Sequence, residues 1–164
     1  VNIVNPSLFK NYPNIKALST ASPDDVFKFI RSISYPNNKA KHLVGMAQML
    51  KNDFKGKVPS EVNELIKLPG VGRKTANVVL NAAFHKPTIA VDTHVFRVSN
   101  RTGLTNGKNP EQVEKQLIKI LPTKHLKKAH HLILLHGRYI CKSRNPLCKK
   151  CVINKICLYK EKNE

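Results

Sequence analysis

Apolar residues recur at helical spacing along most of the chain. The segments at residues 22–30, 38–54 and 127–140 each have an apolar stripe of this period. Residues 87–91, PTIAV, are a short and isolated apolar run with no second run to pair with. The pattern therefore predicts an all-α fold of about seven helices joined by short turns.

The starts of several helices are marked by capping residues. Ser22 precedes Pro23 and two aspartates, which is the order of an N-cap, a first helical proline and a negative first turn. Ser60 is the expected N-cap of a second helix. Asn109 is the expected N-cap of a third, where Gln112 supplies the glutamine of a capping box. These residues predict three helix starts.

The charge is the strongest feature of the composition. The chain has 29 lysine and arginine residues against 10 acidic ones, a formal net charge of +19. Such an excess favours a polyanion, because basic residues that neutralise phosphates release condensed counterions; a lysine bias of the source genome is the alternative. No apolar run is long enough for a membrane span, and the first residues lack the layout of a secretory signal, so we expect a cytoplasmic protein without a membrane partner.

The segment LPGVGRKTANVVLN, residues 68–81, places two glycines between two predicted helices. Gly70 and Gly72 permit positive φ and close backbone approach, so residues 61–81 are predicted to form a helical hairpin. Exposed amides at such a turn, at the positive end of the second helix, suit a phosphate. The alternative is an ordinary corner between two helices, with a glycine that ends the first.

Lys74 lies in the first turn of the second hairpin helix, where a cation is electrostatically disfavoured. The helix field and the neighbouring Arg73 favour the neutral amine, which is the form that a nucleophile requires. Asp92 follows the short apolar run and precedes a predicted helix at residues 93–97. It is therefore either the N-cap of that helix or a catalytic carboxylate, or both.

The four cysteines are confined to one short segment near the end of the chain. A disulfide scaffold would distribute them along the sequence, so the clustering favours an intracellular metal site. Soft thiolates bind either zinc or an iron–sulfur cluster, and the spacing C-x6-C-x2-C-x5-C by itself leaves both open. The candidate ligands are Cys141, Cys148, Cys151 and Cys157.

Three segments of the chain resemble the endonuclease III family of helix-hairpin-helix DNA glycosylases. They are the hairpin at residues 68–81, the segment AVDTHVFRVSNRTGL at residues 90–104, and the segment HGRYICKSRNPLCKKCVINKIC at residues 136–157. They occur in the order and at the separations of that family. The resemblance therefore covers nearly all of the chain.

The resemblance implies a two-lobed all-α fold. A helical-barrel domain would span residues 1–86, and a second domain would span residues 87–164. The loop at residues 141–157 would hold a [4Fe–4S] cluster on its four cysteines. Relative to the family, a few dozen N-terminal residues are expected to be absent, so the barrel domain would be incomplete.

The resemblance also implies a base-excision repair DNA glycosylase with AP-lyase activity, which removes oxidised pyrimidines. Its partner would be double-stranded DNA with damaged pyrimidines or abasic sites, bound by a monomer at the bacterial nucleoid. Lys74 corresponds to the nucleophile that attacks C1′ and forms a Schiff base, and Asp92 to the carboxylate that assists it. The alternatives are a non-catalytic DNA-binding module and a mismatch-specific sibling, whose hairpin has no lysine at this position.

Further DNA contacts are implied by the same resemblance. Ile33 and Tyr35 occupy positions where the family inserts side chains into the gap left by a flipped base. From the residues alone, Tyr35 is also consistent with an aromatic that covers the core, and His94 with a structural histidine. The other expected contacts lie on the hairpin and on single basic residues: Gly70, Val71, Gly72, Arg73, Lys39, His94, Lys142 and Arg144.

Overall fold

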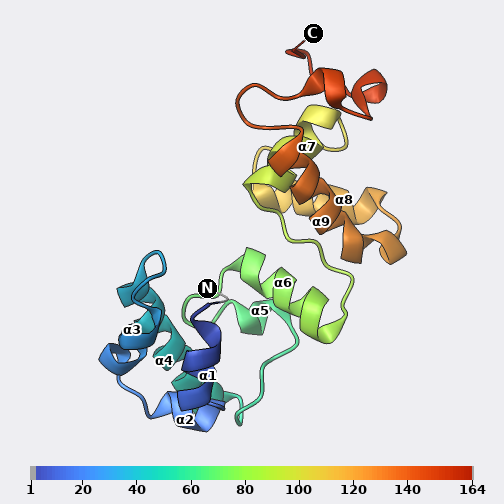
Figure 1. The fold of residues 1–164 in the computed structure, drawn as a ribbon. Helices are drawn as coiled ribbons and strands as arrows, with labels where there is room; N and C mark the ends of the chain where they lie inside the picture. The colour runs from blue at the N-terminus through green and yellow to red at the C-terminus, as the bar shows by residue number, and fades with distance from the viewer. Residues whose placement is uncertain (1–2, 164) are drawn as a thin grey trace. The chain divides into compact units, whose positions relative to one another are not determined.

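The computed structural model describes residues 3–163, apart from the side chain of Lys127. Within that range the regular elements are nine α-helices and two short 3₁₀ helices, with no strand (Figure 1). The prediction of an all-α fold is therefore confirmed. By its contacts the chain divides into two compact units, Val1–Gly72 and Arg73–Glu164. This boundary precedes the one at residue 86 that the sequence suggests, and the assignment of two functional domains stays a prediction.

The first unit is built around the long helix α4. Its helices are α1 (Asn5–Asn11), α2 (Ile15–Ser19), α3 (Pro23–Ile30), α4 (Pro36–Asp53) and α5 (Val62–Leu65). Both α2 and α3 pack along α4. Buried aliphatic side chains from α1, α3 and α4 form one core, which contains Leu8, Val26, Ile30, Ala40 and Val44.

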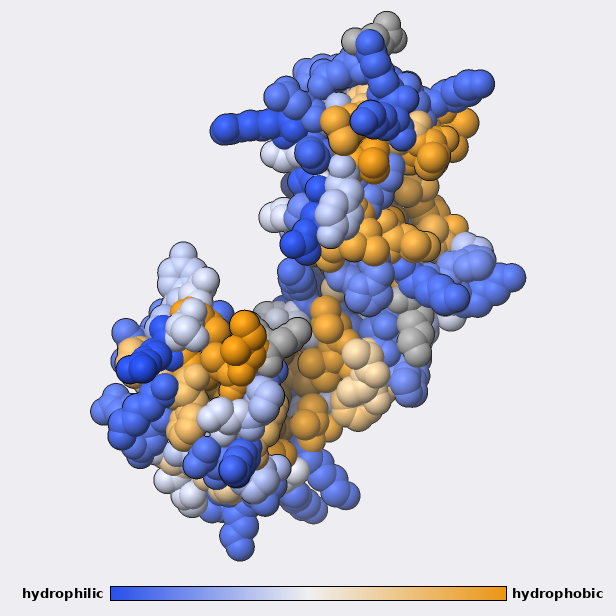
Figure 2. Space-filling model, in the orientation of Figure 1, coloured by the Kyte–Doolittle hydropathy of each residue, from blue (hydrophilic) through white to orange (hydrophobic). Residues whose placement is uncertain are grey.

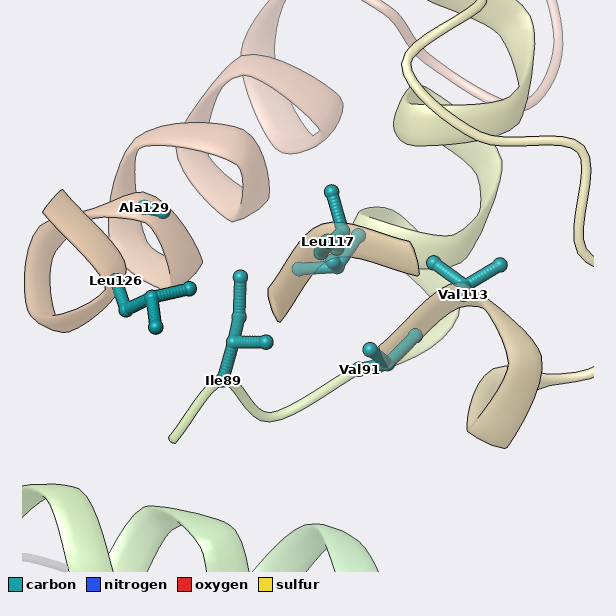
Figure 3. Close-up of a cluster of buried hydrophobic side chains, with 7 residues drawn as sticks. Ile89, Val91, Val113, Leu117, Leu126 and Ala129 are labelled. Atoms are coloured by element: carbon teal, nitrogen blue, oxygen red, sulfur yellow. The ribbon is translucent and has the colours of Figure 1, made fainter. Parts of the chain in front are cut away.

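The second unit has its core among α7, α8, α9 and the segment that precedes α7. Its elements are α6 (Arg73–Phe84), α7 (Thr93–Thr102), α8 (Pro110–Ile120), α9 (Thr123–Tyr139), η1 (Cys148–Lys150) and η2 (Asn154–Ile156). Ile89 and Val91, from the isolated apolar run, are buried among these helices rather than paired in a sheet (Figure 3). The other members of this core are Val95, Val113, Leu117, Leu126 and Ala129.

Two of the three predicted helix caps are confirmed. The Ser22 hydroxyl accepts the Asp25 N–H at 3.1 Å at the start of α3. At the start of α8, Asn109 Oδ1 accepts the Gln112 N–H at 2.9 Å, and the Gln112 side chain accepts the backbone N–H of Lys108 at 2.8 Å. Both caps satisfy N–H groups that a helix start leaves without partners.

The helix α5 differs from the expectation. It has only four residues, and its N-cap is Glu61 rather than Ser60. The predicted cap is wrong because Glu61 still has extended backbone, with φ −121° and ψ 141°, so the helix begins one residue later. The short helices α1 and α2 were not predicted from the sequence.

Much of the surface is hydrophilic. Hydrophilic side chains cover much of the face of each unit that is visible in Figure 2, with apolar patches between them. Across residues 3–163, no helix combines the length and the apolar character needed to cross a membrane.

Candidate active site

The two glycines of the turn between α5 and α6 have different surroundings. Gly70 has a φ of 77°, and a Cβ there would lie 2.9 Å from the Cβ of His42. Gly72 does not have positive φ, and no described atom outside its chain neighbours lies within 4 Å of the Cβ that it lacks. Both glycines permit positive φ, and of the two only Gly70 adopts it. Of these two positions, packing requires glycine only at position 70, and no described contact fills the space beside position 72.

Arg73, the first residue of α6, is held by a carboxylate of the same unit. Its Nε and Nη2 donate to the two carboxylate oxygens of Glu114 on α8, at 3.0 and 2.9 Å. Only 8% of the Glu114 side chain is exposed. The hydrogen bonds to Glu114 raise the pKa of Arg73 above its ordinary value. This bidentate pair fixes the start of α6 against α8, and a DNA contact by Arg73 stays a prediction.

Lys74 and Asp92 lie next to each other. The Nζ of Lys74 is 3.9 Å from Oδ2 of Asp92, and the two side chains are 57% and 10% exposed. Asp92 is also the N-cap of α7, because its Oδ1 accepts the Val95 N–H at 2.8 Å. One oxygen of Asp92 therefore caps the helix while the other is beside the amine. An accessible amine beside a fixed carboxylate is suited to nucleophilic attack coupled to proton transfer.

This amine and this carboxylate share one open pocket. His94, a predicted DNA contact, belongs to the same pocket, so the structure brings it together with the two candidate catalytic residues. The pocket is formed by the start of α6, the segment before α7, the first turn of α7 and the start of α8. Its lining consists of Lys74, Val91, Asp92, Thr93, His94, Phe96 and Pro110.

Arg97, on α7, was missed by the sequence reasoning. Its Nη2 lies 3.2 Å from Nδ1 of His94 and donates to the carbonyl of Gly137 at 2.8 Å. Its Nε and Nη2 both donate to the carbonyl of Cys141, at 3.2 and 3.1 Å. Arg97 therefore connects a side chain of the pocket to the first residue of the cysteine segment.

Arg101, one helical turn after Arg97, holds the next part of the same loop. It donates to the carbonyls of Lys142 at 2.7 Å and Ser143 at 3.0 Å. Its guanidinium lies over the ring of Tyr159, 4.4 Å from the centroid. The sequence places the two arginines on one face of the helix after Asp92, which is the only hint of a shared role. Their partners in the cysteine segment lie about forty residues away in the sequence, so these contacts could not be predicted.

The four cysteines line a single cavity in the second unit. None of them forms a disulfide in the described chain. Over residues 3–163, no three His, Cys, Asp or Glu side chains come close enough to hold one metal ion. His136 lies in the same wall, with Nε2 3.6 Å from Sγ of Cys151, and burial lowers the pKa of its ring.

Comparison with known proteins identifies the family. A model of the HhH-GPD superfamily of base excision DNA repair proteins matches residues 1–123. The chain belongs to the HhH-GPD superfamily. It is 50% identical over 159 residues to the endonuclease III of Rickettsia felis, an alignment that covers 97% of this chain and 75% of the relative. It is 46% identical over 162 residues to the endonuclease III of Escherichia coli K12, covering 97% of this chain and 77% of the relative.

Solved HhH-GPD structures have the same fold. The chain matches a trapped endonuclease III–DNA covalent intermediate, an estranged-adenine complex, with a TM-score of 0.88 and 41% identity over 95% of this chain and 74% of that chain. It matches a thermostable thymine-DNA glycosylase with a TM-score of 0.85 and 28% identity, over 98% of this chain and 76% of that chain. The predicted helix-hairpin-helix fold and the resemblance to endonuclease III are confirmed.

The other DNA contacts expected of an HhH-GPD protein lie in both units. Tyr35 is the N-cap of α4, with a left-handed φ of 55°, and it is 79% exposed. Ile33 instead packs against the core of the first unit, and Lys39 is half-buried. Lys142 and Arg144 are exposed on the loop that Arg101 holds. Their contacts with DNA stay predictions.

Proposed function

We propose that this chain is a base-excision repair DNA glycosylase with AP-lyase activity, and that Lys74 is its nucleophile. The observation that carries the proposal is the pairing of an accessible amine with a fixed carboxylate, 3.9 Å apart, at one pocket of an HhH-GPD protein. A DNA-binding module without catalysis has no need for this pair. The lysine also favours an enzyme with a lyase step over a mismatch-specific glycosylase.

In the proposed reaction, the lone pair of the Lys74 amine attacks C1′ of the damaged nucleotide. The glycosidic bond breaks, and the base leaves with the bonding electrons. Opening of the sugar ring gives a Schiff base between Nζ and C1′. Loss of a proton from C2′ then breaks the C3′–O bond, which cleaves the strand on the 3′ side of the abasic site by β-elimination.

Asp92 is assigned the role of assisting this attack. Its Oδ2 accepts the proton that the lysine must lose, or stabilises the positive charge that develops at C1′. Its Oδ1 is held by the Val95 N–H at 2.8 Å, so the carboxylate is positioned before substrate binds. A group that is fixed in advance does not have to reorganise during the reaction.

The partner of the pocket is DNA. The space at Gly72 allows the backbone amides of the hairpin turn to approach a phosphate, and the net charge of +19 favours association with a polyanion. To reach the pocket, a damaged pyrimidine must leave the base stack, and Tyr35 is the proposed residue that fills the gap. We further propose that the protein acts as a monomer on nucleoid DNA and that its bases are oxidised pyrimidines.

We infer that the four cysteines bind a [4Fe–4S] cluster rather than zinc. Four unpaired thiols line one cavity, yet they do not converge as the ligands of one ion do in the described residues. That arrangement fits a polynuclear cluster with thiolates at its corners. When bound, the cluster would supply iron–thiolate bonds that fix the loop bearing Lys142 and Arg144. The ligands would be Cys141, Cys148, Cys151 and Cys157.

Borohydride trapping on duplex DNA with an abasic site tests the proposed function. The wild-type protein is expected to become covalently attached to DNA, because borohydride reduces the Schiff base to a stable amine. Lys74→Gln is expected to bind DNA without forming the adduct. Lys119→Gln is the matched control, since it removes one exposed charge of the same unit outside the pocket. Binding without an adduct by the wild type would support the non-catalytic module, and base release without an adduct would support the mismatch-specific sibling.

A further inference from the structure

The side chain of Arg97 contacts four acceptors at once. Besides the carbonyls of Gly137 and Cys141, it donates to the carbonyl of Thr93 at 3.4 Å, and its Nη2 lies 3.2 Å from Nδ1 of His94. A guanidinium carries hydrogen-bond donors only and does not lose its proton in proteins. The atom that faces it must therefore be an acceptor. For His94, this contact favours the tautomer in which Nδ1 has no hydrogen.

A neutral imidazole with a bare Nδ1 carries its proton on Nε2. His94 lines the pocket that also contains Lys74 and Asp92. We propose that Arg97 is a positioning residue, which fixes His94 in the tautomer whose Nε2–H is available to substrate in this pocket. Without Arg97, the ring would be free to adopt either tautomer.

The packing of α7 on α9 supports a fixed position for this pair. A Cβ on Gly137 would lie 3.0 Å from the Cβ of His94, 2.9 Å from Cγ2 of Val98 and 3.4 Å from Nη2 of Arg97. The two helices therefore approach closely here because residue 137 has no side chain. Arg97 is held from α9 and from the cysteine segment, so it does not depend on His94 for its position.

The chemistry of the ligand follows from the donor. An Nε2–H available in this pocket would bind an oxygen acceptor, and a phosphate or sugar oxygen of the abasic nucleotide is the class that fits. This inference rests on the proposed function, since it assumes that the pocket receives DNA. It goes beyond that function by assigning Arg97 a role and His94 a tautomer.

Nitrogen-15 NMR of the histidine rings tests the tautomer directly, at a pH of about 8, where an ordinary histidine is neutral. The His94 signals, assigned by their loss in His94→Gln, are expected to show a protonated Nε2 and an unprotonated Nδ1. In Arg97→Met the same ring is expected to show a mixture of tautomers. A proton on Nδ1 in the wild-type protein would overturn the proposal, and so would an unchanged tautomer in folded Arg97→Met.

DNA affinity tests the role of the donor. In His94→Gln the side-chain amide nitrogen takes the approximate place of Nε2, whereas in His94→Asn it takes the place of Nδ1. We expect His94→Gln to keep affinity for abasic-site DNA close to that of the wild type, and His94→Asn and Arg97→Met each to lose roughly tenfold, the cost of one hydrogen bond to a charged group. In the His94→Asn background, Arg97→Met is expected to add little.

The outcomes separate a positioning role from a structural one. A further loss of about tenfold in the His94→Asn background would mean that Arg97 acts on the fold alone, and equal affinities of His94→Gln and His94→Asn would exclude the Nε2 donor. If Arg97→Met does not fold, the wild-type spectrum and the two His94 variants still decide. Failure of the wild type to be trapped by borohydride would defeat the proposed function and leave the NMR result standing.

Discussion

The two glycines of the hairpin turn allow a matched pair of substitutions. In Gly70→Ala, the new Cβ meets the Cβ of His42 at 2.9 Å on a backbone with φ of 77°. The positive φ costs about 1–2 kcal/mol for a residue with a side chain, and overpacking of this kind adds about 1–3 kcal/mol. Gly72→Ala has neither problem, because its φ is not positive and the described structure places no contact within 4 Å of the added carbon. Its free energy of unfolding should stay within about 1 kcal/mol of the wild type.

Urea denaturation followed by circular dichroism measures the free energy of unfolding of each variant. Fluorescence anisotropy with abasic-site DNA at fixed salt measures its affinity for DNA. Gly72→Ala is expected to keep its stability and to lose roughly tenfold or more in affinity, because the methyl group blocks hydrogen bonds from the turn to a phosphate. Gly56→Ala is the control for backbone strain, since Gly56 has φ of 73° but no described atom within 4 Å of its missing Cβ. The reasoning is refuted if Gly72→Ala binds DNA like the wild type, or if Gly70→Ala is no less stable than Gly56→Ala.

Three more changes test other parts of the structure. Arg73→Met leaves the buried carboxylate of Glu114 without its half-exposed partner, so we expect the free energy of unfolding to fall by about 1–3 kcal/mol in urea titrations. An unchanged midpoint would show that the pair is not structural. Cys148→Ser should lower the bound iron and the visible absorbance, and stoichiometric zinc in the wild-type protein, measured by elemental analysis, would contradict the assigned cluster. Tyr35→Gly removes the strain of a positive φ, which costs about 1–2 kcal/mol in a residue with a side chain, so the variant should be more stable. It should also bind abasic-site DNA less tightly, and unaltered anisotropy would exclude Tyr35 from the interface.

Features that depend on residues close together in the sequence, such as helix caps, could be predicted from the sequence. The caps at Ser22 and Asn109 bond to N–H groups three residues away, so a short stretch of sequence contains both partners. Asp92 was recognisable as a cap or a carboxylate for the same reason. Ser60 failed as a cap because the backbone at Glu61, not the side chain, decides where α5 begins. The shortest helices have too few residues for a periodic pattern to appear.

Contacts between distant segments could not be read from the sequence. Arg73, on α6, donates to Glu114 on α8. Arg97, on α7, donates to the carbonyl of Cys141, which follows α9 in the sequence. Positive φ at Gly70 but not at Gly72 likewise depends on how the turn packs, since the two residues are of one type and two positions apart. From the sequence alone, a basic residue that contacts phosphate cannot be distinguished from one whose side chain is bound by a carboxylate or carbonyl of the folded protein.

The central claim is that the amine of Lys74 forms the bond to DNA. Mass spectrometry of the borohydride-reduced adduct, after digestion of protein and DNA, measures which residue carries the sugar fragment. We predict a single modified peptide, with the added mass on Lys74, beside the carboxylate of Asp92. An adduct on a different lysine or on the N-terminal amine would contradict the account.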